Sequence, residues 1–118
     1  MNCIFCKIIS KDAPANIIYE DDNTIAFATK DPVSKGHTLV IPKAHVENLF
    51  DISRQELADL GVTTQKVATL LKDHHRATGM NLLHASGKDA QQSVSHFHLH
   101  IVPRFKDDGL DMWIKQGL

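Results

Sequence analysis

The sequence predicts an α+β fold: a single domain with a mostly antiparallel five-stranded sheet, one long helix and one short helix. Five short apolar runs are typical of strands, whereas one longer run repeats its apolar residues with helical spacing. Most connections between the strands are too short for a crossover helix, which favours antiparallel pairing. The 118 residues suffice for one compact domain and not for two, so we assign residues 1–118 to one domain.

The first half of the chain contains the short helix, over residues 4–10, and three strands. The strands predicted at 17–20 and 24–28 flank the turn signal Asp21-Asp22-Asn23, so we expect them to form a hairpin. The third strand covers residues 37–41 and is followed by a proline.

The long helix has a recognisable start and one apolar face. Ser53 and Glu56 form a capping-box signature, in which each side chain can bond the other residue's backbone amide. Apolar residues and one threonine then recur every three or four positions as far as about residue 76: Leu57, Leu60, Thr64, Val67 and Leu71. Gly79 is suited to end the helix.

Composition excludes several classes of function. Hydrophobic residues make up 42% and charged residues 23%, as in an ordinary soluble globular protein. The net charge of −1 indicates neither a nucleic-acid groove nor an anionic membrane as partner. The longest apolar stretches are too short to span a bilayer, and the N-terminal segment does not resemble a signal peptide. We therefore expect a cytoplasmic protein.

Three histidines alternate with apolar residues in the last predicted strand, residues 96–102, which a polar loop separates from a strand at 81–85. Successive side chains of a strand point to opposite faces. His96, His98 and His100 would therefore share one face of the sheet, while the apolar residues between them face the core.

The histidine run has two chemical interpretations besides a merely polar surface. A shared metal ion is disfavoured, because the α-carbons of His96 and His100 lie about 13 Å apart in a strand, whereas zinc needs nitrogens at about 2.0–2.1 Å. Phosphate chemistry is favoured, because a neutral imidazole can attack phosphorus and its neighbour can donate a hydrogen bond to a phosphate oxygen. The preceding loop, residues 86–93, offers small residues, amides and a hydroxyl that can hold an anion.

The run 96–102 matches the pattern of alternating histidines that defines the histidine triad, and the chain resembles the HIT superfamily there. The segments 3–9, 36–45 and 92–94 are also similar to the Hint branch and its bacterial Hit relatives. The similar segments lie in the same order and cover nearly the whole chain.

The resemblance implies a HIT-like fold, a homodimer, and cleavage at the α-phosphate of purine nucleotides. Expected substrates are nucleoside 5′-phosphoramidates, aminoacyl adenylates or dinucleoside polyphosphates. His98 would be the nucleophile that forms a covalent nucleotidyl intermediate, which water then hydrolyses. His100 would contact the phosphate, and His96 would set the orientation and tautomer of His98. Ser93 would lie near the leaving group, with the amides of Gln91 and Gln92 supporting the phosphate oxygens.

Some positions depart from the family pattern. Thr29 replaces the acidic residue that usually binds the ribose hydroxyls, although Asp31 follows two residues later. Ala85 replaces a common asparagine, and Gln91 replaces a glycine. These changes weaken the expected ribose and phosphate contacts. The alternative function is therefore a non-catalytic nucleotide-binding or interaction protein of the same fold.

Cys3 and Cys6 have the Cys-x-x-Cys spacing that makes up half of a tetrahedral zinc site. His45 and His96 are the candidates for the other two ligands, an arrangement that resembles the one in related galactose-1-phosphate uridylyltransferases. Our hypothesis is a structural zinc that holds His96 and thereby positions His98. In the alternative, both cysteines pack as small apolar residues in the first helix. Without a secretion signal, a disulfide is the weaker interpretation.

Structural or packing roles are predicted for His37, His84 and Trp113. We interpret His37 as a structural residue that begins a strand. His84 is expected to take over a polar contact that asparagine makes in relatives. The apolar tail around Trp113 is expected to pack on a second copy of the chain.

Overall fold

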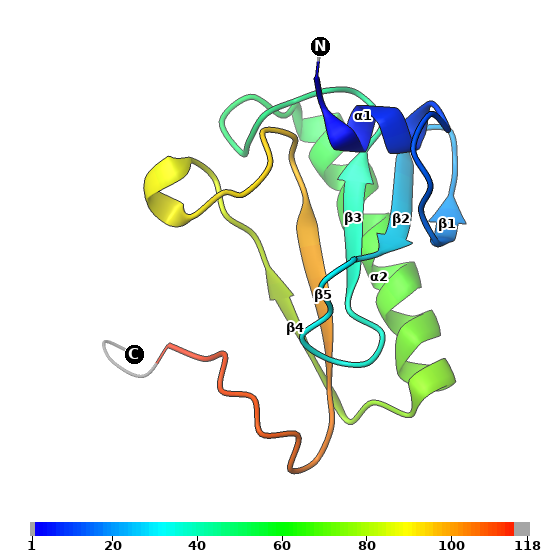
Figure 1. Ribbon diagram of the computed structural model, residues 1–118, viewed down its shortest axis with the longest axis vertical. Coiled ribbons are helices and arrows are strands. Elements are labelled where there is room, and N and C mark those ends of the chain that lie inside the picture. The colour runs from blue at the N-terminus through cyan, green and yellow to red at the C-terminus, as the bar shows by residue number, and fades with distance from the viewer. Residues whose placement is uncertain (1, 115–118) are drawn as a thin grey trace.

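The computed structural model describes residues 2–114 and confirms the predicted α+β class. Figure 1 shows the elements in chain order: α1 (Ile4–Ile9), β1 (Ile17–Glu20), β2 (Thr24–Ala28), β3 (Thr38–Pro42), α2 (Arg54–His75), β4 (Gly79–Leu83) and β5 (Leu99–Arg104). A short 3₁₀ helix, Lys88–Ala90, lies in the loop between β4 and β5 and was not predicted. No helix within residues 2–114 combines the length and the apolar character needed to cross a bilayer.

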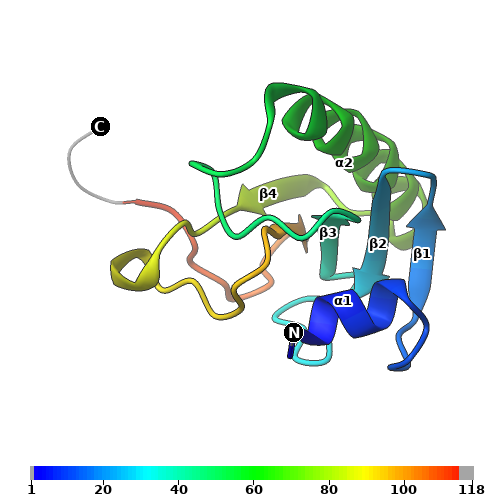
Figure 2. The ribbon, with the colours of Figure 1, turned by 90° about the horizontal axis from the view of Figure 1, so that it is seen from above.

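The five strands form one sheet in the order β1-β2-β3-β5-β4, and all four neighbouring pairs are antiparallel. The predicted five-stranded sheet is therefore confirmed. The long helix α2 covers one face of the sheet, and the short helix α1 lies against the other face (Figure 2). The central strands β2 and β3 are covered on both faces, so nearly all of their residues are buried.

Alternation along the strands divides the core into two parts. On the α1 side, Phe5 and Ile8 of the helix pack against alternate residues of β2 and β3 such as Phe27. On the α2 side, the residues between them pack against the helix: Ala26, Val40, Leu60, Val67, Leu71, Phe97 and Ile101. The apolar positions predicted for the long helix thus form its buried face, except Leu57, which is 40% exposed.

The helix ends differently from the sequence prediction. Ser53 caps α2 through the predicted capping box with Glu56. At the other end, however, Arg76 adopts the left-handed conformation (φ 58°, ψ 40°) and stops the helix, while Gly79 is the first residue of β4. The amides of Arg76 and Ala77 both donate to the carbonyl of Lys72, which satisfies the helix end without a glycine.

The predicted strand 96–102 is wrong at its first three residues, because β5 begins at Leu99. In residues 96–98, side chains rather than the backbone amides of a neighbouring strand bond the backbone carbonyls. The carbonyl of His96 accepts a bond from the His98 ring, and the carbonyl of His98 accepts one from the His84 ring. His96 and His98 are buried, at 0% and 4% exposed, with Phe5 of α1 packed against both rings, rather than lying on an open sheet face.

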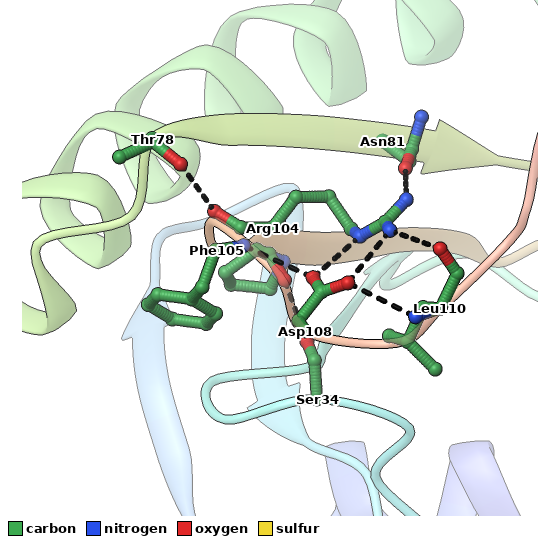
Figure 3. A network of polar contacts seen from close by, with 8 residues as sticks. Ser34, Thr78, Asn81, Arg104, Phe105, Asp108 and Leu110 are labelled. Atoms are coloured by element: carbon green, nitrogen blue, oxygen red, sulfur yellow. Dashed lines mark hydrogen bonds and ion pairs between the residues drawn. The ribbon is translucent and has the colours of Figure 1, made fainter.

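Arg104, the last residue of β5, attaches the following turn to the sheet (Figure 3). Its guanidinium donates to the Asp108 carboxylate at 2.8 and 2.9 Å and to the Asn81 side chain of β4 at 2.8 Å. The carboxylate also accepts from the backbone amides of Phe105 and Leu110, at 3.0 Å each. These bonds, led by that from Arg104, hold the pKa of Asp108 well below its ordinary value. Beyond this turn, Trp113 is 68% exposed.

Candidate functional site

His98 is held in one tautomer by its own backbone neighbourhood. Its Nδ1 lies 2.8 Å from the carbonyl oxygen of His96, so Nδ1 bears the proton and donates it. The Nε2 atom of the neutral ring therefore keeps its lone pair. Phe5 of α1 packs edge-on against the ring, with centroids 5.3 Å apart. Burial lowers the pKa of His98, although the bond to the His96 carbonyl opposes this shift, so the ring is neutral at pH 7.

His100 is oriented by His37, which the sequence interpretation had treated as merely structural. The backbone amide of Val33 donates to Nδ1 of His37 at 3.1 Å, so the proton of that ring is on Nε2. This proton is donated to Nδ1 of His100 at 2.9 Å. The proton of the neutral His100 ring is therefore on Nε2, where it is available as a donor. The centroids of the His98 and His100 rings are 5.2 Å apart.

The loop before His37 is fixed by close packing. Gly36 has φ +88°, and a Cβ added there would lie 2.7 Å from the His75 ring. The hydroxyl of Ser34 donates to the carbonyl of Pro103 at 2.8 Å. This loop therefore holds His37, and through it His100, against the end of α2 and β5.

The burial of His100 leads to a prediction about pH and stability. Burial, followed by the nearby histidines, lowers its pKa from 6.5 to about 4. Between these pH values the unfolded chain binds a proton that the folded chain does not, so stability is complete above 6.5 and falls as pH falls towards 4. The His100 contribution has a limiting slope of about 1.4 kcal/mol per pH unit. Urea unfolding should therefore show a shallower acid dependence for His100→Asn; an unchanged slope would contradict this.

A cavity of about 480 Å³ opens beside the two histidines. Its apolar walls come from α1 and the central strands: Ile4, Phe5, Ile8, Phe27 and Leu39. His98, His100 and Ser93 line it as well. Its remaining polar lining comes from Asn16 and from the loop after β2: Thr29, Lys30 and Asp31. Thr29, which replaces the usual acidic residue, and Asp31, which follows it, both line the cavity.

Of the five predicted phosphate-binding residues, Ser93, His98 and His100 line this cavity, whereas Gln91 and Gln92 do not. The amide nitrogens of Gln91 and Gln92 donate to the carbonyls of Lys88 and Gly87. The side-chain amide of Gln92 donates to the carbonyls of Glu47 and Val94, at 2.7 and 2.9 Å. These bonds close the loop that presents Ser93. Contacts of Gln91 and Gln92 with phosphate stay a prediction.

Cys3, Cys6, His45 and His96 meet at the start of α1 and form a group that can hold a metal ion, with one ligand atom from each within 4.8 Å of the others. The Nε2 proton of His96 is donated to the carbonyl of Pro42 at 2.9 Å, which leaves Nδ1 as the ligand atom. Both cysteines are free thiols. Burial and the nearby Cys3 thiol raise the pKa of Cys6 to about 11 in the absence of a metal ion.

The distances within this group are close to those between the ligands of a tetrahedral zinc ion. His96 Nδ1 lies 3.5 and 3.6 Å from the two sulfurs, and 3.1 Å from Nδ1 of His45. Cys6 Sγ lies 3.2 Å from the same His45 nitrogen. Zinc bonds of about 2.3 Å to sulfur and about 2.0–2.1 Å to nitrogen imply ligand separations of roughly 3.3–3.8 Å in a tetrahedron. The separations of His96 from the two sulfurs lie in this range, whereas the two that involve His45 are shorter. The donor set is therefore chemically suited to zinc, and the geometry fits for His96 and both sulfurs.

Known proteins share this architecture. The HIT domain family matches residues 10–107. The chain is 44% identical over 109 residues to Protein hit of Bacillus subtilis, covering 92% of this chain and 75% of that protein. The chain belongs to the HIT domain family. The crystal structure of the protein SMU.412c from Streptococcus mutans has a TM-score of 0.94 at 39% identity, covering 100% of this chain and 76% of its own.

A second solved structure bears on the metal site. It is described as a zinc-bound histidine triad family protein from Mycobacterium smegmatis. It has a TM-score of 0.90 and 42% identity to this HIT domain, and covers 94% of this chain and 81% of its own. The zinc is a property of that relative; in this HIT domain, Cys3, Cys6, His45 and His96 form a group that could hold a metal ion.

The contacts of two further histidines of this HIT domain were not recognised from the sequence. His37 lies far from the histidine run in the chain, and only the pairing of β3 with β5 brings it to His100. His84 uses both ring nitrogens, on the His98 carbonyl and on the Ser86 hydroxyl. That it takes over a contact made by asparagine in relatives stays a prediction. A histidine at the start or end of a predicted strand was the only available signal.

Proposed function

We propose that the protein is a nucleotidyl hydrolase that cleaves at the α-phosphate of purine nucleoside phosphoramidates or related adenylates and dinucleoside polyphosphates. The main support is His98: its Nδ1 proton is held by the His96 carbonyl, and it lines a cavity with a neutral, nucleophilic ring. Binding alone would not require a nucleophile whose tautomer is set in this way.

The cavity matches the parts of a nucleotide. Phe27, Leu39 and Phe5 provide an apolar surface for a planar base. Thr29 and Asp31 offer oxygens to the ribose hydroxyls. At the other side, the Nε2 proton of His100 is directed by His37 and serves as a donor to a phosphate oxygen.

The proposed reaction has two displacements at phosphorus. The Nε2 lone pair of His98 attacks and the bond from phosphorus to the leaving nitrogen breaks. The leaving nitrogen takes a proton from the Ser93 hydroxyl, which regains one from solvent, so that the amine departs neutral. The ring then carries a positive charge, which the His96 carbonyl stabilises through its bond to Nδ1–H. Water next attacks phosphorus, releases the nucleoside monophosphate and a proton, and restores the neutral His98 ring.

Zinc, when bound by Cys3, Cys6, His45 and His96, would neutralise the two thiolates and join α1 to the segment that precedes β5. The chain's own residues then do the positioning. The same His96 that supplies a ligand nitrogen also supplies the carbonyl that bonds His98. We propose a cytoplasmic location because such thiol ligands persist in reduced form there.

The test of this proposal is release of AMP and ammonia from adenosine 5′-phosphoramidate, followed by chromatography, with rapid quenching and mass spectrometry to detect the nucleotidyl protein. AMP release with a transient adduct of adenylate mass would support the proposal. Tight binding of the nucleotide without AMP release would instead support the alternative, a non-catalytic nucleotide-binding protein.

We also propose that the protein is a homodimer paired along β4. This strand lies at one edge of the sheet, and a groove lined by Leu57, Met80, Leu82 and Leu99 runs between it and α2. Leu82 is 55% exposed in the single chain. Light scattering should give twice the chain mass, and Leu82→Asp should shift the protein towards monomer because pairing would bury its charge. A monomeric native protein would contradict the dimer.

A further inference from the structure

His84 occupies the place where the two last strands separate. The paired residues of β4 and β5 end at Leu83 and His100. Beyond this pair, the side chain of His84 bonds the main chain of His98 in place of a ladder amide, with Nδ1 2.9 Å from the carbonyl oxygen. The last contact between the strands is thus made by a side chain, immediately beside the proposed nucleophile.

A hydrogen-bond chain fixes the direction of this contact. The backbone amide of Leu49 donates to the Ser86 hydroxyl oxygen at 2.9 Å. The Ser86 hydroxyl therefore has its own proton to donate, and its partner is Nε2 of His84. With Nε2 as the acceptor, the proton of the neutral His84 ring is on Nδ1, from which it is donated to the His98 carbonyl. Each donor in this series of three hydrogen bonds therefore has one acceptor.

Packing holds the His84 ring as firmly as its bonds do. The ring stacks on Phe97 with centroids 4.2 Å apart and planes inclined by 23°. Phe97 is itself buried at 2% exposed, and its amide donates to the carbonyl of Val46 at 2.7 Å. The buried Phe97 ring therefore fixes the position of the His84 ring, which in turn holds the His98 carbonyl.

We propose that His84 is a positioning residue for His98, acting through the His98 carbonyl rather than through the substrate. The His98 side chain is bonded to the carbonyl of His96, and its own carbonyl is bonded to His84. Loss of the second bond would free the peptide after His98 to rotate and would misalign Nε2 in the cavity. The catalytic part of this inference rests on the proposed hydrolase function.

Two substitutions separate the hydrogen bond from the packing. His84→Phe keeps a ring on Phe97 but removes the donor, whereas His84→Asn keeps an amide donor near the position of Nδ1 but removes the ring. We expect His84→Phe to lower kcat by about 10- to 100-fold with little change in KM, as for other groups that orient a catalytic residue. His84→Asn should stay within about threefold of the native kcat, because the carbonyl keeps its donor. His74→Phe, at an exposed histidine, is the matched control.

A spectroscopic measurement tests the same inference without turnover. Long-range ¹H–¹⁵N spectra of the imidazoles should show His98 with its proton on Nδ1 in the native protein and in His84→Asn. In His84→Phe the same signals should show mixed tautomers. If His84→Phe does not fold, Ser86→Ala provides the second variant, since it removes the hydroxyl that directs the His84 proton, and it should shift the same signals partly.

The outcomes distinguish this inference from the proposed function. Native kcat and native His98 signals in His84→Phe would overturn the positioning role. Equal impairment of His84→Asn and His84→Phe would also overturn it, because the donor would then not matter. If the native protein releases no AMP, the hydrolase proposal fails, and the His98 spectra still decide whether His84 orients the ring.

Discussion

Replacing His98 with alanine is expected to abolish AMP release, with kcat lowered by about 10⁴-fold or more, as when other enzymes lose a nucleophile. The reason is that Nε2 of His98 is the only protein atom in the proposal that forms a bond to phosphorus. The adenylate adduct seen by mass spectrometry should disappear together with turnover. The measurement is a comparison of AMP release by the native protein and by the variant at saturating adenosine 5′-phosphoramidate.

Two controls make the His98 result specific. Calorimetry should show that His98→Ala still binds AMP, since the apolar walls around Phe27 and Leu39 are unchanged. His74→Ala, at an exposed position on α2, should keep full activity. A His98→Ala protein that binds AMP and still releases it at the native rate would show that another group attacks phosphorus.

Removal of zinc is expected to have the second-largest effect, on stability. A ligand that binds only the folded state adds about 4 kcal/mol at a concentration 1,000 times its Kd. Cys3 and Cys6 of α1 would be joined by the metal to His45 and His96, so its loss should release the first helix from the sheet. We therefore expect chelation to lower the Tm by roughly 10–20 °C, measured by calorimetry.

The matched variant for the metal site is Cys6→Ala, which removes one ligand. Its Tm should be low and should not change on addition of zinc or chelator, whereas His74→Ala should respond like the native protein. Elemental analysis should find one zinc per native chain. A content well below one, or a Tm that chelation leaves unchanged, would contradict a structural zinc and favour cysteines that only pack against Phe5 and Ile8.

Local signals in the sequence were sufficient where neighbouring residues determine the structure. The capping box at Ser53 marked the start of α2, because both of its bonds are made within one turn. The turn after Glu20 was recognisable because Asp21 bonds the amides of Asn23 and Thr24. Gly79 was misread as the helix end, because Arg76 can adopt the left-handed conformation once Lys72 accepts its amide.

The sequence by itself therefore determined the fold class, the helix starts and the alternation that separates Phe97 from the histidines on either side of it. It also indicated the set of four metal-ligand residues, by type and by resemblance. Only the tertiary structure decided which ring nitrogen of His96 and of His100 bears the proton, because their partners, Pro42 and His37, lie far from them along the chain. Burial of His98, the role of His37 and the position of His84 are set by strand pairing and packing, and no local pattern encodes them.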